Sequence, residues 1–168
     1  MAIRTAYWTT LLIASWCVMT VTHEFGHIVG GTFCGGTLVD ANLLPWHLPY
    51  SIFQPDPHPL VTLWCGPILG VLLPFAIAIL LRREWMWFIS DFCLIANGIY
   101  IGTAWFSNDR FLDTPQLIKH GTQPSLILIY CIVTIGLGYW RFRNSCMREW
   151  TKTTPKKPTS ELDQAHNK

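Results

Sequence analysis

Residues 6–34 read AYWTTLLIASWCVMTVTHEFGHIVGGTFC, an apolar run that carries His23, Glu24 and His27 toward its end. As a helix rising 1.5 Å per residue, this run is long enough to cross the roughly 30 Å hydrocarbon core of a bilayer. Arg4 precedes it, as a charged residue precedes the core of a signal peptide, but no small-residue cleavage site follows. The sequence therefore predicts a retained transmembrane helix with polar residues in its second half.

The rest of the chain shares this apolar character. Of its 168 residues 51% are hydrophobic and 13% are charged, a balance that excludes an ordinary soluble globular protein. Three more tracts, 60–81, 85–106 and 125–140, are apolar enough to be read as spans. We predict an all-α fold, a polytopic membrane bundle of about four transmembrane helices, formed by residues 1–140 as one domain.

Basic residues predict how this bundle is oriented, because Lys and Arg beside spans stay on the cytoplasmic side. Arg4, the pair Arg82 and Arg83, and the basic residues after Trp140 all mark one side, whereas the segment 35–59 contains no Lys or Arg. We therefore expect an integral, multi-pass membrane protein with cytoplasmic N- and C-termini. Asp91 is expected near the same side, in a pairing role.

The polar segment 141–168 has no apolar period, and Pro155 and Pro158 stand among its Lys and Thr residues. It is predicted to be a basic, disordered cytoplasmic tail. The formal net charge of +2 lies mostly in this tail, so it indicates a lipid bilayer as partner and no nucleic acid.

Small residues inside the predicted spans indicate close helix packing. Three glycine pairs have the small-xxx-small spacing that lets helix backbones approach, namely Gly26 with Gly30, Gly66 with Gly70, and Gly98 with Gly102. The six cysteines occur singly and without a CxxC pair, so they are interpreted as apolar packing residues rather than disulfides or zinc ligands.

His23 and His27 are the residues that indicate chemistry. Four residues apart on a helix, their imidazoles project from one face about one turn apart, which suits a shared metal ion. Glu24 is placed to reach a water on the metal without being a ligand, the division of roles in HExxH metalloproteases. An alternative is that these residues only mark where the span leaves the bilayer, but Ile28 and Val29 resume the apolar character.

A catalytic zinc site needs a third protein ligand and an open position. By the predicted topology this ligand comes from the outer loops or span ends, where Asp109 and Asp113 stand in the third loop. The segment from Asp113 onward is typical of a short helix with Pro115 at its first position, so a helix-capping role for Asp113 is the competing interpretation. The remaining candidates are Asp40, Asp56, His47, His58 and His120.

Three segments resemble the site-2 protease family of intramembrane zinc metalloproteases. They are HEFGHIVGG at residues 23–31, HPLVTLWCGPILGVLLP at 58–74, and LDTPQLIKHG at 112–121. The resemblance covers roughly residues 6–124. It departs from the family pattern at Thr114, where the family usually has glycine after its aspartate, and Asp109 therefore remains an alternative to Asp113.

This resemblance implies a zinc ion held by His23, His27 and Asp113, with Glu24 as the general base. It also implies that Asn97 contacts the substrate backbone, although hydrogen bonding between helices accounts for Asn97 equally well. The expected activity is that of a zinc metalloendopeptidase that cleaves a membrane protein or peptide, with Glu24 activating the zinc-bound water.

Two other functions are compatible with parts of the pattern. A membrane zinc-binding protein of the same fold without proteolytic activity would share the ligands, but a purely structural site needs no base at Glu24. A transporter is disfavoured because the halves of the chain do not repeat and spans two to four hold little charge.

Overall fold

The computed structural model describes residues 2–107 and 109–153. Over these residues the chain forms five helices and two strands: α1 (Ala2–Phe33), β1 (Leu38–Asn42), β2 (Tyr50–Phe53), α2 (Pro59–Leu81), α3 (Glu84–Ala104), α4 (Asp113–Lys119) and α5 (Pro124–Thr153). The prediction of a mostly helical chain is confirmed.

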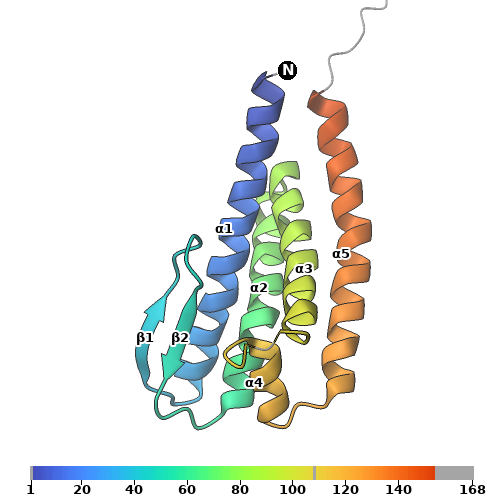
Figure 1. Cartoon of the computed structure of the whole chain (residues 1–168). Coiled ribbons are helices and arrows are strands. Elements are labelled where there is room, and N and C mark those ends of the chain that lie inside the picture. Colours follow the sequence, from blue (N-terminus) through green and yellow to red (C-terminus); the bar gives the residue numbers. More distant parts are fainter. Residues whose placement is uncertain (1, 108, 154–168) are drawn as a thin grey trace, which may run out of the picture.

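The four long helices lie side by side, with α1 packed mainly against α2 and α5 mainly against α3 (Figure 1). The N-terminal end of α1 and the C-terminal end of α5 lie at one end of the bundle, and the strands and α4 lie toward the other. Two apolar clusters fill the interior, one around Met19 and Phe88 and the other around Ile101 and Leu117. The second cluster ties α4 to the bundle.

Three helices in the described part of the chain, α2, α3 and α5, are long and apolar enough to cross a membrane by length and composition. The fourth predicted span, 6–34, does form a helix, and α1 is longer than any of the three. It is not among the candidate spans, because residues such as Thr22, His23, Glu24 and His27 reduce its hydropathy. By length and composition, three helices in the described residues could thus cross a membrane, whereas the sequence predicted four.

The predicted disorder from residue 141 onward is wrong for residues 141–153, which continue α5. The reason is that polar side chains of this segment find partners on other helices. Arg141 Nε donates to Asp91 Oδ1 at 2.7 Å, and Glu149 Oε2 accepts a hydrogen bond from the Tyr7 hydroxyl at 2.7 Å. Residues 154–168 of the predicted tail lie outside the described residues.

Strands β1 and β2 form an antiparallel hairpin that the sequence did not predict, paired from Leu38 with Phe53 to Asn42 with Tyr50. The hairpin lies beside α1 (Figure 1). Its turn reaches back to Trp16, whose Nε1 donates to the carbonyl of Pro45 at 3.1 Å. A Cβ on Gly31 would lie 2.5 Å from the ring of Phe53, so this glycine lets the hairpin pack on the helix.

Close packing of α1 on α2 follows from the predicted glycine pairs. A Cβ on Gly30 would lie 2.6 Å from the Cβ of Cys65, and one on Gly66 would collide with the imidazole of His27. The missing side chain at Gly66 therefore provides the space that the His27 ring occupies.

Candidate metal centre

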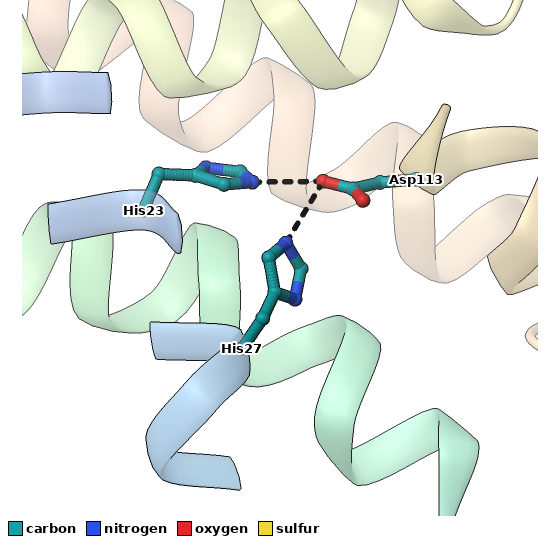
Figure 2. A group of neighbouring side chains, drawn as sticks. All are labelled: His23, His27 and Asp113. Atoms are coloured by element: carbon teal, nitrogen blue, oxygen red, sulfur yellow. Dashed lines mark hydrogen bonds and ion pairs between the residues drawn. The ribbon is translucent and has the colours of Figure 1, made fainter. Parts of the chain in front are cut away.

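Three predicted ligands from distant parts of the sequence meet at one point, as Figure 2 shows. His23 and His27 come from α1, and Asp113 is the first residue of α4. Asp113 Oδ2 lies 2.8 Å from His23 Nε2 and 3.4 Å from His27 Nε2. All three residues are buried. The i, i+4 spacing on α1 brings the two imidazoles together, with ring centroids 4.9 Å apart.

A hydrogen bond of its Nδ1 atom fixes the position of each imidazole. His27 Nδ1 lies 2.9 Å from the carbonyl oxygen of Thr62, and His23 Nδ1 lies 2.6 Å from Asn97 Oδ1. The amide of Asn97 is itself oriented, because its Nδ2 donates to the carbonyl of Cys93 at 2.8 Å. Since a carbonyl oxygen only accepts hydrogen bonds, both Nδ1 atoms carry a hydrogen.

In the neutral form of each ring, Nε2 then presents a lone pair toward Asp113. Two imidazole lone pairs and a carboxylate oxygen, all acceptors, face one another within 4.8 Å. Only a cation resolves such an arrangement: protons on the imidazoles, or one metal ion bound by all three atoms. Metal-bound histidines typically donate their other ring N–H to a protein acceptor, as both do in this cluster.

One of the three spacings already matches a metal site, while the ligand set as a whole spans up to 4.8 Å, so the two imidazoles would have to move closer together around an ion. Ligand atoms about 2.0 to 2.1 Å from a tetrahedral centre stand about 3.3 Å apart, close to the 3.4 Å separation of His27 Nε2 and Asp113 Oδ2. The separation from His23 Nε2 to Asp113 is shorter by about half an ångström, a difference that a small shift of the carboxylate removes. Two histidines and one aspartate suit zinc and other divalent transition metals alike.

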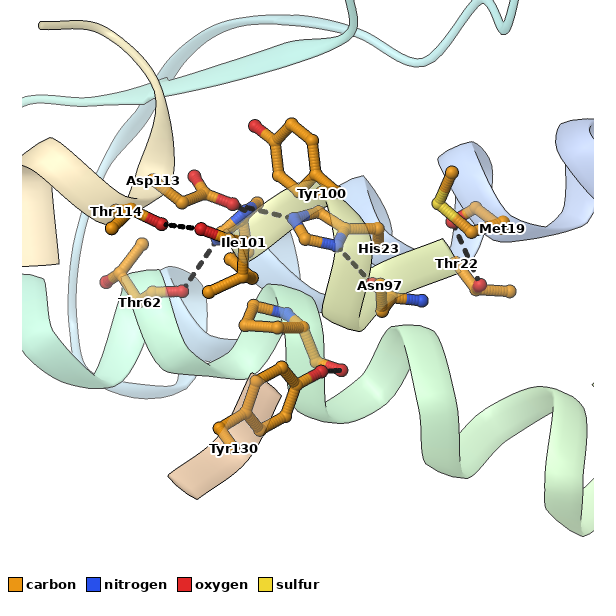
Figure 3. A network of polar contacts seen from close by, with 12 residues as sticks. Met19, Thr22, His23, Thr62, Asn97, Tyr100, Ile101, Asp113, Thr114 and Tyr130 are labelled. Carbon is orange, nitrogen blue, oxygen red and sulfur yellow. Dashed lines mark hydrogen bonds and ion pairs between the residues drawn. The ribbon is translucent and has the colours of Figure 1, made fainter. Parts of the chain in front are cut away.

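The surroundings of Asp113 favour the ionised form of its carboxyl group. Burial alone would raise the pKa of its carboxyl group, but the charges and hydrogen bonds of His27 and His23 outweigh burial and hold the pKa below its ordinary value. The predicted short helix is present as α4, with Leu112 at its N-cap and Pro115 at its third position. Thr114 fastens this turn, since its hydroxyl donates to the carbonyl of Ile101 at 2.6 Å (Figure 3).

Glu24 lies beside the cluster and faces open space. It is 6% exposed, and its carboxylate makes no hydrogen bond or ion pair with another side chain within residues 2–107 and 109–153. Together with His27 and Asp113 it lines a cavity of about 690 Å³ between the hairpin, the start of α2 and α4. A buried carboxylate beside three converging ligand atoms, at the wall of a cavity, suits proton transfer to or from a molecule bound there.

The other ligand candidates do not join the cluster, which is the only group of its kind in the described part of the chain. Asp109 lines the cavity but is exposed, and its Oδ1 accepts from the backbone N–H of Phe111 at 2.9 Å. Asp40 accepts from the hydroxyl of Tyr50, and Asp56 from that of Thr62. His47, His58 and His120 also remain outside it.

Asn97 is completely buried, and the structure gives it the contact with His23. It orients a ligand; its contact with a substrate stays a prediction. Sequence reasoning missed the carbonyl of Thr62, which no residue type could have signalled, because every residue has a carbonyl. It also missed Tyr100, whose ring stands edge-on to His23 at 5.2 Å; its position three residues after Asn97 on α3 was the available signal.

No protein-family model, curated protein or solved structure matches this chain.

Proposed function

We propose that the protein is an intramembrane zinc metalloprotease similar to the site-2 protease family, which hydrolyses peptide bonds of membrane-associated proteins or peptides. The observation that carries this proposal is the meeting of His23, His27 and Asp113 beside Glu24 at the wall of one cavity. A site that only binds a metal ion would account for the two histidines and the aspartate. Glu24 lines the cavity without belonging to that group, and its carboxylate favours an enzyme over a purely structural metal site.

The residues divide the work in the following way. His23 and His27 through Nε2, and Asp113 through a carboxylate oxygen, would hold the ion, while Thr62 and Asn97 fix the two rings. Zinc, when bound, would acidify a water molecule and polarise the scissile carbonyl. Glu24 takes the proton of the attacking water and then passes it to the leaving amine nitrogen.

The shape of the cavity suits an extended substrate. Residues of β2 form one wall, with Tyr50, Ile52 and Phe53 among them. In the described part of the chain β2 pairs only with β1, so its second edge is available for an added strand. An extended segment exposes the carbonyls that a transmembrane helix keeps in its own hydrogen bonds, so a helical substrate must unwind before cleavage.

The proposal places α1 in the membrane as a fourth span beside α2, α3 and α5. Its polar residues are then sheltered by the bundle, as buried ionisable groups in membrane proteins usually are. Both described ends of the chain lie at one end of the bundle (Figure 1). We propose that this end is cytoplasmic, since Arg4 lies in the first turn of α1 and Arg141 lies in the C-terminal half of α5. A C-terminal fusion that fluoresces only in the cytoplasm would remain dark if this orientation is wrong.

The decisive experiment is cleavage of a membrane-anchored reporter by the purified, zinc-loaded protein, with Glu24→Gln as the comparison. Loss of a general base lowers kcat by roughly 10²- to 10⁴-fold. We expect this fall with unchanged zinc stoichiometry, because Glu24 is not a ligand in the structure. If Glu24→Gln cleaves as fast as the parent, the proposed mechanism is wrong.

The same experiment separates the protease from a zinc-binding protein without activity. Zinc bound at one ion per chain, with no cleavage of any membrane-anchored reporter by the parent, would favour the second function. Bound zinc that persists in the His23→Ala and His27→Ala double variant would contradict both.

A further inference from the structure

Hydrolysis of a peptide bond puts negative charge on the carbonyl oxygen, and a hydrogen-bond donor at that position stabilises it. Among the residues that the structure describes, no Lys or Arg lines the cavity. Three of its lining side chains already donate to protein acceptors: Tyr50 to Asp40, Thr62 to Asp56, and Gln116 to the carbonyl of Arg110. Few hydrogen-bond donors in the described cavity lining therefore remain for a substrate oxygen.

Ser51, His120 and Tyr100 are the other cavity-lining side chains with a donor outside the ligand set. Ser51 belongs to β2, and His120 is exposed at the end of α4. Only Tyr100 contacts the metal centre. Its ring stands edge-on to the imidazole of His23, with the centroids 5.2 Å apart and the planes at 88°.

The hydroxyl of Tyr100 points beyond the His23 ring toward the side of Asp113, as Figure 3 shows. The phenol is thus close to two of the three ligands and open to the cavity, on the helix that also supplies Asn97. For this hydroxyl to act, a carbonyl bound between His23 and Asp113 would have to lie within hydrogen-bond distance of it.

We propose that Tyr100 is a catalytic residue of the proposed reaction, whose hydroxyl donates a hydrogen bond to the carbonyl oxygen of the substrate as that oxygen becomes negative. This inference rests on the proposed function and adds a substrate-contacting group to it. The aromatic ring has a second task, packing against His23, which a phenylalanine would perform equally.

The step balances without an additional reactant. The water oxygen forms a bond to the carbonyl carbon, the π electron pair moves to the carbonyl oxygen, and Glu24 takes the water proton. When the C–N bond breaks, this electron pair restores the carbonyl, and the proton passes from Glu24 to the amine nitrogen. Tyr100 keeps its own proton throughout and stabilises the oxygen only by hydrogen bonding.

Tyr100→Phe tests the proposal, because it removes the hydroxyl and keeps the ring. The matched control is Tyr139→Phe, at an exposed tyrosine of α5 outside the cavity. Three quantities are measured for each zinc-loaded protein: zinc affinity, kcat and KM on the reporter, and affinity for a phosphinic pseudopeptide that mimics the tetrahedral species. Binding of the phosphinic probe requires no turnover.

For Tyr100→Phe we expect zinc affinity and KM within about twofold of the parent, and kcat lower by roughly 100-fold, as for loss of one oxyanion donor. The phosphinic pseudopeptide should bind at least about tenfold more weakly, while the unmodified peptide binds as before. Tyr139→Phe should match the parent in every measurement.

Equal probe affinity in Tyr100→Phe and the parent would overturn the role of Tyr100, whatever the reporter shows. Loss of zinc from Tyr100→Phe would overturn it too, since the residue would then only support His23. If the parent binds the probe but cleaves no reporter, the proposed protease function fails, and probe binding alone decides whether Tyr100 contacts the anionic oxygen.

Discussion

The two imidazoles of the cluster present the same nitrogen to the centre, Nε2, because each Nδ1 donates to a fixed acceptor. Asp113 completes the set from α4, 90 residues after His23 in the chain. Burial raises the pKa of its carboxyl group, but the charges and hydrogen bonds of the two histidines outweigh burial and hold the pKa below the ordinary value. The three residues thus form a group that could hold a metal ion.

A pair of variants tests whether Asp113 is the third metal ligand. Asp113→Asn keeps the size of the side chain and removes its charge, so we expect zinc affinity to fall by roughly 100-fold or more. Asp109→Asn, four residues earlier and also on the cavity wall, should leave zinc affinity within about twofold. Isothermal titration of both proteins with zinc measures this difference, and equal losses in the two would place the third ligand elsewhere.

Packing of helix on helix decides how precisely these residues are held. Gly66 on α2 faces the ring of His27, and Gly70 faces the amide of Asn97, where a Cβ would lie 2.8 Å from Oδ1. The small residues that bring α2 close to α1 therefore also shape the space around both imidazoles. If the cluster binds a metal ion, helix packing and metal binding depend on the same surface of α2.

Gly66→Ala should accordingly weaken zinc binding, because the added methyl group displaces the imidazole of His27. We expect a loss of about tenfold or more in zinc affinity, comparable with the loss of an outer-shell contact. Gly136→Ala on α5 is the matched control, since a Cβ there meets no atom within 4 Å. It should leave zinc affinity unchanged and stabilise the helix slightly; similar zinc affinity in both variants would argue against this dependence.

The elements differ in how far the sequence could predict them. The i, i+4 histidines and Glu24 were recognisable because their geometry is local to one helix. The hairpin was not, since both strands are short, β2 lies between Pro49 and Pro55, and the connection between the strands contacts Trp16 of α1, which is distant in sequence. The extension of α5 past Trp140 was missed because its partner Asp91 is 50 residues away in the chain.

Across the whole molecule, buried polar contacts stabilise the end of the bundle remote from the hairpin. Asp91 is 1% exposed, and it accepts hydrogen bonds from Arg141 Nε at 2.7 Å and the Ser145 hydroxyl at 2.6 Å. This confirms the pairing role expected of Asp91, with a partner on α5. The guanidinium of Arg141 also lies near the rings of Phe75 and Trp87, so one residue links α5 with both α2 and α3.

Arg141→Leu should leave the buried charge of Asp91 without its partner and lower the free energy of unfolding by about 3 to 5 kcal/mol. Asp91 precedes Asn97 by six residues, about 9 Å along the helix, so zinc affinity should change little. Denaturant titration in detergent measures the first quantity. The double variant Asp91→Leu with Arg141→Leu should recover most of the loss, and a double variant as unstable as the single one would contradict this account.

One of the two acceptors that bind an Nδ1 atom is a main-chain oxygen and the other is a side-chain oxygen, and this difference limits which substitutions each position tolerates. The acceptor for His27 is the main-chain carbonyl of residue 62, which almost any amino acid at that position supplies. The acceptor for His23 is the side chain of Asn97, and few residue types offer an oxygen at that length and orientation. Random substitution at the two positions, followed by selection for a working metal site, should therefore yield many amino acids at position 62 and almost none but asparagine at position 97.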